Sequence, residues 1–283
     1  MRTKNMIGEY RSYPKLLWEL QKANKGIQVN KHPYGHGKNQ YISYFSPEKH
    51  RKETTIVYIH GGGWRQGSPT TFKCIGQRFA DLGYDTVLLG YRHAPRNKYP
   101  IQAEDVFAGL AAYTKLQKNN GINVGNIVVI GSSAGAHLGA ILVYDRNLQG
   151  KYGISQAMFR GFISLGGPLV FEECKNRTIA ALLNGLFSDQ FNRELGEPYS
   201  LLTGNEGTSV LCIHAERDPF CEPENSIRFV NKVNDYQPGL AQCHIEKDSK
   251  MFHSNLAAGI LLSDNPIAEL LYSWIERLPK KEM

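Results

Sequence analysis

The chemistry of this sequence centres on a short motif of glycine and serine. Residues 127–130, Ile-Val-Val-Ile, are an apolar and mostly β-branched run that predicts a strand buried on both faces of a parallel sheet. The motif Gly131-Ser132-Ser133-Ala134-Gly135 follows at once, and the residues after it continue as a helix. A strand that turns this sharply into a helix holds its central serine above the sheet. We therefore predict that Ser133 is a nucleophile.

A serine nucleophile needs a base to take its proton. The chain has nine histidines, and His253 is the one that lies in a loop after the last predicted strand. Folds in which the nucleophile comes first along the chain place their base there, so we predict His253 as the base. His60 begins a glycine loop and is expected to orient it, and His137 is expected to pack or to cap behind the nucleophile.

The base in turn needs an acid that orients its ring. Asp218 lies four residues beyond the predicted strand 209–214, in the loop at its carboxyl end. Asp248 is the competitor, because it is nearer to His253 along the chain and also follows the last strand. Members of such a site meet in space rather than in sequence, so we predict Asp218 as the acid and keep Asp248 as the alternative.

Acyl transfer also requires hydrogen-bond donors for the oxyanion. Three consecutive glycines in His60-Gly61-Gly62-Gly63-Trp64 directly follow the predicted strand 54–59. Glycines let the backbone approach a substrate closely and turn its N–H groups inward. We assign the oxyanion hole to Gly62 and Gly63, together with the N–H of Ala134 after the nucleophile.

The elements that must position these residues alternate between strand and helix over most of the chain. This alternation predicts a single α/β domain over residues 1–283, with a mostly parallel, doubly wound sheet and helices on both faces. Two strands at 27–34 and 40–45 predict an antiparallel edge. An amphipathic helix at 12–25 predicts a lid formed by residues 1–26, and the irregular stretch at about 168–207 predicts a small cap insertion.

Composition excludes several classes of function. The net charge is +7, and residues 1–55 carry 11 Lys and Arg against 4 Glu and no Asp. This basic segment either binds anionic substrates or surfaces, or is simply a charged region exposed to solvent. No nucleic-acid motif accompanies these charges. We also expect no membrane span, a cytoplasmic location, and five reduced cysteines whose spacing provides no metal site. The sequence is compatible with a monomer and with a homo-oligomer.

From about Ile27 to the C-terminus the chain resembles the α/β-hydrolase fold. The glycine loop, the segment Tyr91-Arg92-His93-Ala94-Pro95, the serine motif and the Asp218 and His253 loops resemble the hormone-sensitive-lipase-like esterases and the related acetyl-esterase and kynurenine-formamidase group. The resemblance implies a Ser133, Asp218, His253 triad, an oxyanion hole at Gly62, Gly63 and Ala134, and no cofactor.

These observations predict a serine carboxylesterase that cleaves small or medium acyl esters through an acyl-enzyme. An amidohydrolase such as an arylformamidase is the alternative, because it needs the same groups and differs in its pocket. A ligand-binding protein that has lost catalysis on the same fold is a third possibility. Such proteins usually lack a triad member, and this chain keeps all three.

Overall fold

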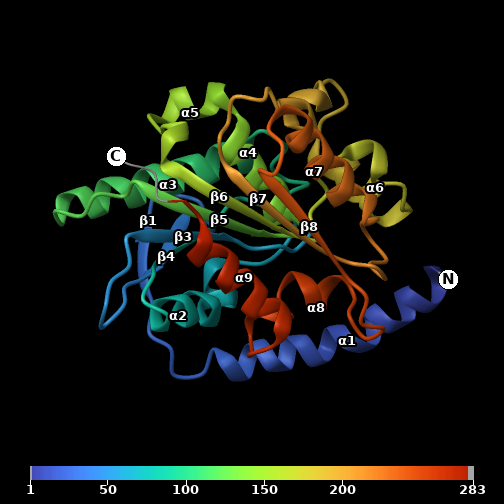
Figure 1. Cartoon of the computed structure of the whole chain (residues 1–283), viewed down its shortest axis with the longest axis horizontal. Helices are drawn as coiled ribbons and strands as arrows, with labels where there is room; N and C mark the ends of the chain where they lie inside the picture. The colour runs from blue at the N-terminus through green and yellow to red at the C-terminus, as the bar shows by residue number, and fades with distance from the viewer. Residues whose placement is uncertain (1, 280–283) are drawn as a thin grey trace.

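The computed structural model describes residues 2–279, which form an eight-stranded sheet in the order β1-β2-β4-β3-β5-β6-β7-β8 (Figure 1). β1 and β2 pair antiparallel, β2 pairs antiparallel with β4, and every pair from β4 to β8 is parallel. The strands are β1 Asn30–Pro33, β2 Tyr41–Phe45, β3 Thr54–Ile59, β4 Asp85–Leu89, β5 Asn126–Ser132, β6 Phe159–Leu165, β7 Ser209–Ala215 and β8 Ala241–Glu246.

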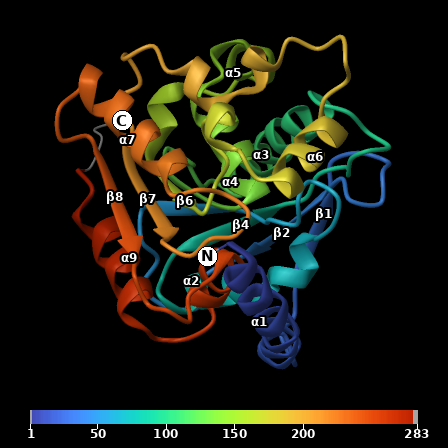
Figure 2. The ribbon, with the colours of Figure 1, turned by 90° about the vertical axis from the view of Figure 1, so that its right-hand side faces the viewer.

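Helices cover both faces of this sheet. Figure 2 shows α3 to α7 on one face and α1, α2 and α9 on the other. The helices are α1 Arg2–Ala23, α2 Lys73–Asp81, α3 Ile101–Asn119, α4 Ala134–Tyr144, α5 Arg146–Tyr152, α6 Arg177–Leu186, α7 Glu224–Tyr236, α8 His253–Ala257 and α9 Pro266–Arg277. The predicted doubly wound α/β architecture is therefore confirmed.

The two faces hold separate hydrophobic cores. All residues of β3, β4, β5 and β6 are buried, because each strand pairs on both sides and is covered on both faces. The core under α3, α4 and α7 contains Phe107, Leu138 and Phe229, and the other core contains Phe79, Leu256 and Trp274. This rigid sheet aligns the carboxyl ends of β3, β5, β7 and β8 along one edge, where the predicted site residues follow.

The predictions for the two cap segments need correction. Residues 168–207 are not uniformly irregular, because α6 lies within them, begins at the Asn176 cap and buries Ile179, Leu183 and Leu186. The N-terminal helix begins at Arg2 rather than near Ser12, and Pro14 lies inside it. Ser12 is not a cap, since its hydroxyl donates to the Glu9 carbonyl one turn earlier.

The longer α1 is explained by its contacts with the rest of the chain. Pro14 lies on the exposed side of the helix, where the carbonyl that loses its hydrogen bond can reach water. Leu16 and Leu20 are each only 4% exposed and pack into the same core as Leu256 and Leu261. One face of α1 thus belongs to the core, while a lid function for the helix stays a prediction.

None of the helices described between residues 2 and 279 is long and apolar enough to cross a membrane. In the same part of the chain, no cluster of three or more His, Cys, Asp and Glu side chains could hold a metal ion. All five cysteines are free thiols, and four of them are buried.

Replacing Leu20 by alanine should destabilise the fold, because it deletes buried methyl groups and leaves a cavity between α1 and the core. Such changes cost roughly 2–5 kcal/mol, which urea denaturation can measure. Leu17→Ala is the matched control, since Leu17 is 46% exposed on the same helix. If both variants unfold at the same urea concentration as the wild type, α1 is not part of the core.

Candidate active site

The turn that carries Ser133 joins β5 to α4 in a strained conformation. Ser133 has φ 51° and ψ −118°, a backbone conformation that residues other than glycine rarely adopt. A Cβ atom at Gly131 would lie 2.4 Å from the Ala136 Cα, and one at Gly135 would lie 2.0 Å from the Ile59 carbonyl oxygen. Only glycine fits at both positions, so the predicted sharp turn from strand to helix is present.

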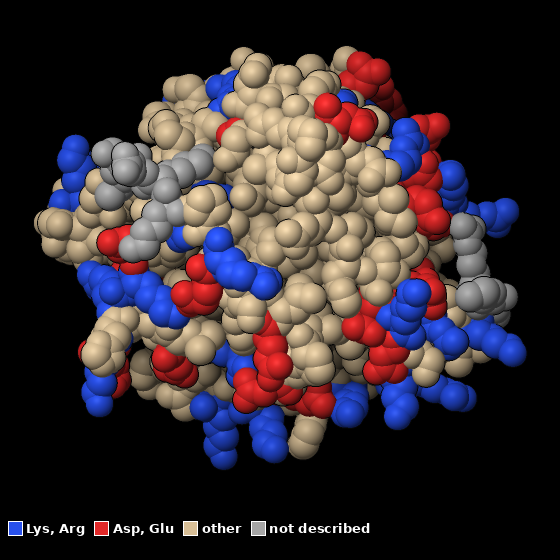
Figure 3. Space-filling model, viewed as in Figure 1, with Lys and Arg blue, Asp and Glu red and all other residues tan. Residues whose placement is uncertain are grey.

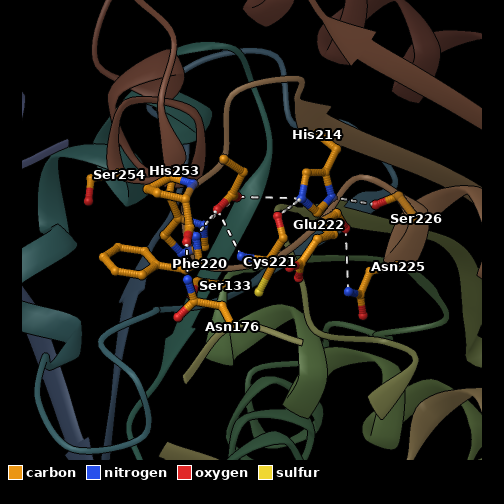
Figure 4. Close-up of polar contacts among 12 residues, drawn as sticks. Ser133, Asn176, His214, Phe220, Cys221, Glu222, Asn225, Ser226, His253 and Ser254 are labelled. Carbon is orange, nitrogen blue, oxygen red and sulfur yellow. Dashed lines mark hydrogen bonds and ion pairs between the residues drawn. The ribbon is translucent and has the colours of Figure 1, made fainter. Parts of the chain in front are cut away.

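His253 connects Ser133 to Asp218 by two short hydrogen bonds (Figure 4). The Nε2 atom of His253 lies 2.7 Å from the Ser133 hydroxyl oxygen, and Nδ1 lies 2.6 Å from Oδ2 of Asp218. Because a carboxylate only accepts, Nδ1 carries the proton and Nε2 is free to accept from the serine hydroxyl. The structure thus brings together all three residues that the sequence predicted, in the tautomer that a base requires.

Asp218 is held by four donors and its side chain has no exposed surface. Its Oδ1 atom accepts from the backbone N–H groups of Phe220, at 2.8 Å, and Cys221, at 2.9 Å. Its Oδ2 atom faces both His253 and a second histidine, His214, whose Nε2 lies 3.4 Å away. The carboxylate is therefore fixed in position and fully provided with donors.

The sequence did not single out His214 as part of this network. This buried ring at the end of β7 places Nε2 3.0 Å from the Cys221 carbonyl oxygen, and Nδ1 2.8 Å from the Ser226 hydroxyl on α7 (Figure 4). Since the carbonyl only accepts, Nε2 carries the proton and Nδ1 accepts from Ser226. The available signal was the position of His214 near the end of β7, four residues before Asp218 in the loop that follows this strand.

The electrostatics of the pair favour an ionised acid and a basic imidazole. Burial by itself would raise the pKa of Asp218, but the charge of His253 and the hydrogen bonds from His214 and His253 hold that pKa well below its usual range. Burial of the ring lowers the pKa of His253, whereas the charge and hydrogen bond of Asp218, aided by Glu9, raise it above its usual value overall. Asp218 is therefore ionised near neutral pH, and His253 holds its proton more strongly than a free histidine.

Asp248 lies apart from these residues. Its Oδ1 atom accepts from the backbone N–H of Lys250 at 2.9 Å, in an exposed turn after β8. Among residues 2–279, His253 has no hydrogen bond or ion pair with Asp248, and its carboxylate partner is Asp218.

The glycine loop lies against the serine turn. A Cβ atom at Gly61 would lie 3.3 Å from the Ser133 Cβ, so the two segments are in close contact. The N–H groups of Gly62, Gly63 and Ala134 find no hydrogen-bond acceptor within residues 2–279, and all three residues line the cavity that contains Ser133. These are the donors that the sequence assigned to an oxyanion.

Two buried histidines support this loop, as the sequence predicted for His60. The Nδ1 atom of His60 lies 2.8 Å from the Gly61 carbonyl oxygen, and its ring stacks on Tyr91 with 4.5 Å between centroids. His137 packs below, where Nε2 lies 2.8 Å from the Gly196 carbonyl oxygen and Nδ1 accepts from the Trp64 indole. Burial lowers the pKa of both histidines to about 4, so both rings are neutral near pH 7.

A residue that the sequence did not predict, Glu9 of α1, holds the start of α8. Glu9 is only 2% exposed, and both of its oxygens lie 3.2 Å from the Ser254 N–H, while one also accepts from the Ser254 hydroxyl. The other end of α8 is tied to β5, because the Ser132 hydroxyl donates to the Ala257 carbonyl. Glu9 lies seven residues before Leu16, on the same side of α1, and this spacing was the signal available in the sequence.

The cavity above Ser133 has a volume of about 610 Å³. Its walls come from α1, the glycine loop, α6, the Asp218 loop and α8, and they are mostly apolar. Side chains that line it on the α1 side include Tyr10, Tyr13 and Leu17, and those on the α6 side include Ile179 and Leu182. An apolar chamber with a few convergent polar groups is typical of a small-molecule site.

The strand order, the two helical layers and the position of the site at the carboxyl ends of the strands define the α/β-hydrolase fold. Esterase B from Lactobacillus rhamnosis has the same fold, with a TM-score of 0.74 and 18% sequence identity over 98% of this chain and 94% of that chain. Residues 43–233 match the family model BD-FAE, and the chain belongs to this family.

Two curated relatives are similar over a shorter stretch. Bovine arylacetamide deacetylase (Bos taurus) is 36% identical over 90 residues, which are 30% of this chain and 23% of that protein. An acetyl-hydrolase from Streptomyces hygroscopicus is 35% identical over 85 residues, which are 30% of this chain and 27% of that protein. The chain thus spans less than a third of the length of these relatives.

Exchanging each aspartate for asparagine should separate the two candidate acids. Asp218→Asn leaves the shape of the side chain but favours the wrong tautomer of His253, and kcat/KM for an activated ester should fall by roughly 10³–10⁴-fold. Asp248→Asn is the matched control and should change kcat/KM by less than about tenfold, because a single exposed interaction is weak. The reverse order would move the acid to Asp248.

Glu9→Gln should shift the pH dependence of activity. The substitution removes a negative charge that stabilises the protonated imidazole, so the pKa of His253 should fall. His253 would then be unprotonated at lower pH, and the acid limb of kcat/KM against pH should move to lower pH. Glu19→Gln, on the same helix and paired with Lys15, is the control that should leave the limb in place. A Glu9→Gln limb that is unmoved or moves to higher pH contradicts the charge effect.

Proposed function

We propose that this protein is a serine carboxylesterase that hydrolyses esters with small or medium acyl groups. The observation that carries the proposal is the hydrogen-bonded series Ser133, His253 and Asp218, which lies beside three N–H groups that have no acceptor within residues 2–279. That arrangement supplies the nucleophile, the base, its orienting acid and the oxyanion donors that acyl transfer needs.

The proposed reaction has two halves. Ser133 attacks the ester carbonyl as His253 takes the hydroxyl proton, and the N–H groups of Gly62, Gly63 and Ala134 stabilise the oxyanion. His253 then gives the proton to the departing alcohol, which leaves an acyl group on Ser133. In the second half His253 activates water, which releases the acid and restores the serine, while Asp218 keeps the ring oriented and stabilises its positive charge.

The cavity supports the proposed substrate class. A volume of about 610 Å³ with apolar walls suits an uncharged acyl chain of limited length. Amides require the same groups, and the bovine relative is named for an arylacetamide, so an aryl amide is the second substrate to test. None of the relatives reported above is named as a formamidase.

We also propose that the protein works in the cytoplasm. The support is that all five cysteines are free thiols, as expected in a reducing compartment.

Turnover and covalent labelling test the proposed nucleophile. Ser133→Ala should lower hydrolysis of nitrophenyl acetate by at least about 10⁴-fold and abolish labelling by an organophosphonate, because no hydroxyl remains to attack. Ser132→Ala is the matched control and should still be labelled, since the Ser132 hydroxyl is bonded to Tyr58 and Ala257. Labelling of the Ser133→Ala protein at the wild-type rate would place the nucleophile elsewhere.

The substrate class is tested with the wild-type protein on nitrophenyl esters from acetate to laurate, beside an acetanilide and a formanilide. Hydrolysis that is fast for short esters and falls steeply for longer ones is expected. Activity confined to either anilide would replace the esterase by an amidohydrolase.

A further inference from the structure

Exposed apolar side chains are concentrated on α1. Nine large hydrophobic residues are exposed in the described part of the chain, and five of them belong to this helix. Their exposed fractions are 48% for Ile7, 68% for Tyr10, 37% for Tyr13, 46% for Leu17 and 60% for Trp18. The other four are scattered over other elements. The five residues of α1 are therefore the main cluster of exposed, large apolar side chains in the described part of the chain.

The exposed side of α1 divides into two adjacent stripes. With 3.6 residues per turn, the buried residues Glu9, Leu16 and Leu20 share one face of the helix. Going round the helix from that face, the next positions form an apolar stripe, made of Tyr13, Leu17, Tyr10, Ile7 and Trp18. The positions after those form a basic stripe, made of Arg11, Lys4, Lys22 and Lys15, all of them exposed.

The basic stripe gives this side of the molecule a positive charge. One of the two acidic residues of α1, Glu9, is buried against Ser254, and the other, Glu19, pairs with Lys15 at 3.6 Å. Figure 3 shows Lys and Arg side chains projecting along the lower edge of the molecule, where α1 lies in Figure 1, with Asp and Glu side chains as well as uncharged ones between them. The ammonium of Lys22 also lies 5.4 Å from the centre of the Trp18 ring, so the two stripes touch.

The apolar stripe continues into the cavity that holds Ser133. Tyr10, Tyr13 and Leu17 belong to the stripe and also line that cavity. A second hollow of about 690 Å³ lies between the C-terminal half of α1, including Trp18 and Lys22, and residues 70–73. Tyr10, Tyr13 and Leu17 thus belong both to the exposed stripe of α1 and to the wall of the cavity that holds Ser133.

We propose that α1 docks on an anionic lipid surface. Helices of this kind lie in the membrane interface with their apolar side chains at the boundary of the acyl chains and their cations among the head groups. The basic stripe is complementary to anionic head groups, and Trp18 is a residue that favours the interface. A nucleic acid would match the cations but not the apolar stripe, and a second copy of this chain would bring its own like charges against the basic stripe.

The docking does not depend on the proposed esterase activity, because it involves only the outside of α1. One consequence does rest on that activity: an ester dissolved in the lipid would reach Ser133 along Tyr10, Tyr13 and Leu17. The substrate class would then be uncharged, lipid-borne esters.

Tryptophan fluorescence with lipid vesicles tests the docking without any turnover. The chain has three tryptophans; Trp64 and Trp274 are 0% and 6% exposed, so a change in emission reports mainly on Trp18. Vesicles made of equal parts of phosphatidylcholine and phosphatidylglycerol should shift the emission of the wild-type protein to shorter wavelength and should sediment with it. Vesicles of phosphatidylcholine should do neither, and high salt should reverse the binding.

Matched variants separate the helix from general charge effects. The double variant Lys4→Glu with Lys22→Glu should weaken sedimentation with the anionic vesicles by at least about tenfold. Lys115→Glu with Lys118→Glu makes the same change of charge on the exposed side of α3 and should bind nearly as the wild type does. Ile7→Ser should weaken binding and leave hydrolysis of a soluble ester unchanged, because Ile7 does not line the cavity.

Four results would overturn the docking proposal. Equal loss of binding in both charge variants, or no loss in Ile7→Ser, would indicate general attraction of a basic protein to anions. Absence of binding to anionic vesicles, in a protein that hydrolyses soluble esters, would remove the proposal and leave the esterase function standing. A dimer in analytical ultracentrifugation that Trp18→Ser dissociates would assign the stripe to a second copy of this chain.

Discussion

A buried negative charge organises the carboxyl edge of the sheet. The Asp218 side chain is entirely removed from water, and a carboxylate in that position is stable only if donors replace the water it has lost. Two of its donors are backbone N–H groups of its own loop, and two are histidines. Meeting this requirement ties the loop after β7 to the start of α8 through His253, and through His214 and Ser226 it also involves α7.

The acid therefore does more than orient one ring. Because Oδ1 is saturated by Phe220 and Cys221, only Oδ2 is available to the two histidines. His253 occupies the shorter contact, and His214 shares its own proton between Oδ2 and a carbonyl oxygen. The backbone N–H groups of Phe220 and Cys221 thus hold Asp218, and Asp218 in turn holds His253 beside Ser133.

Local pattern was enough to predict the strands that position the site and the three residues that meet at Ser133. The motif around Ser133 requires glycine on both sides for steric reasons, and those reasons act within a few residues. The same holds for the strand predicted at 54–59, whose bounds agree with β3. Glu9 and His214 could not be recognised in this way, because their roles come from Ser254 and Asp218, which only the folded chain brings to them. The start of α1 was missed for a related reason: a proline inside a helix is unfavourable locally, and tertiary packing of Leu16 and Leu20 outweighs it.

The contact between Glu9 and Ser254 joins residues that are 245 positions apart in the chain. During synthesis, which proceeds at about 5–20 residues per second, α1 therefore emerges well before its partner helix α8. For most of that time α1 has no folded surface to bury Glu9, Leu16 and Leu20. The site at Ser133 is therefore completed only after α8 has emerged, and a chain that stops before α8 lacks both His253 and the partner that α1 needs.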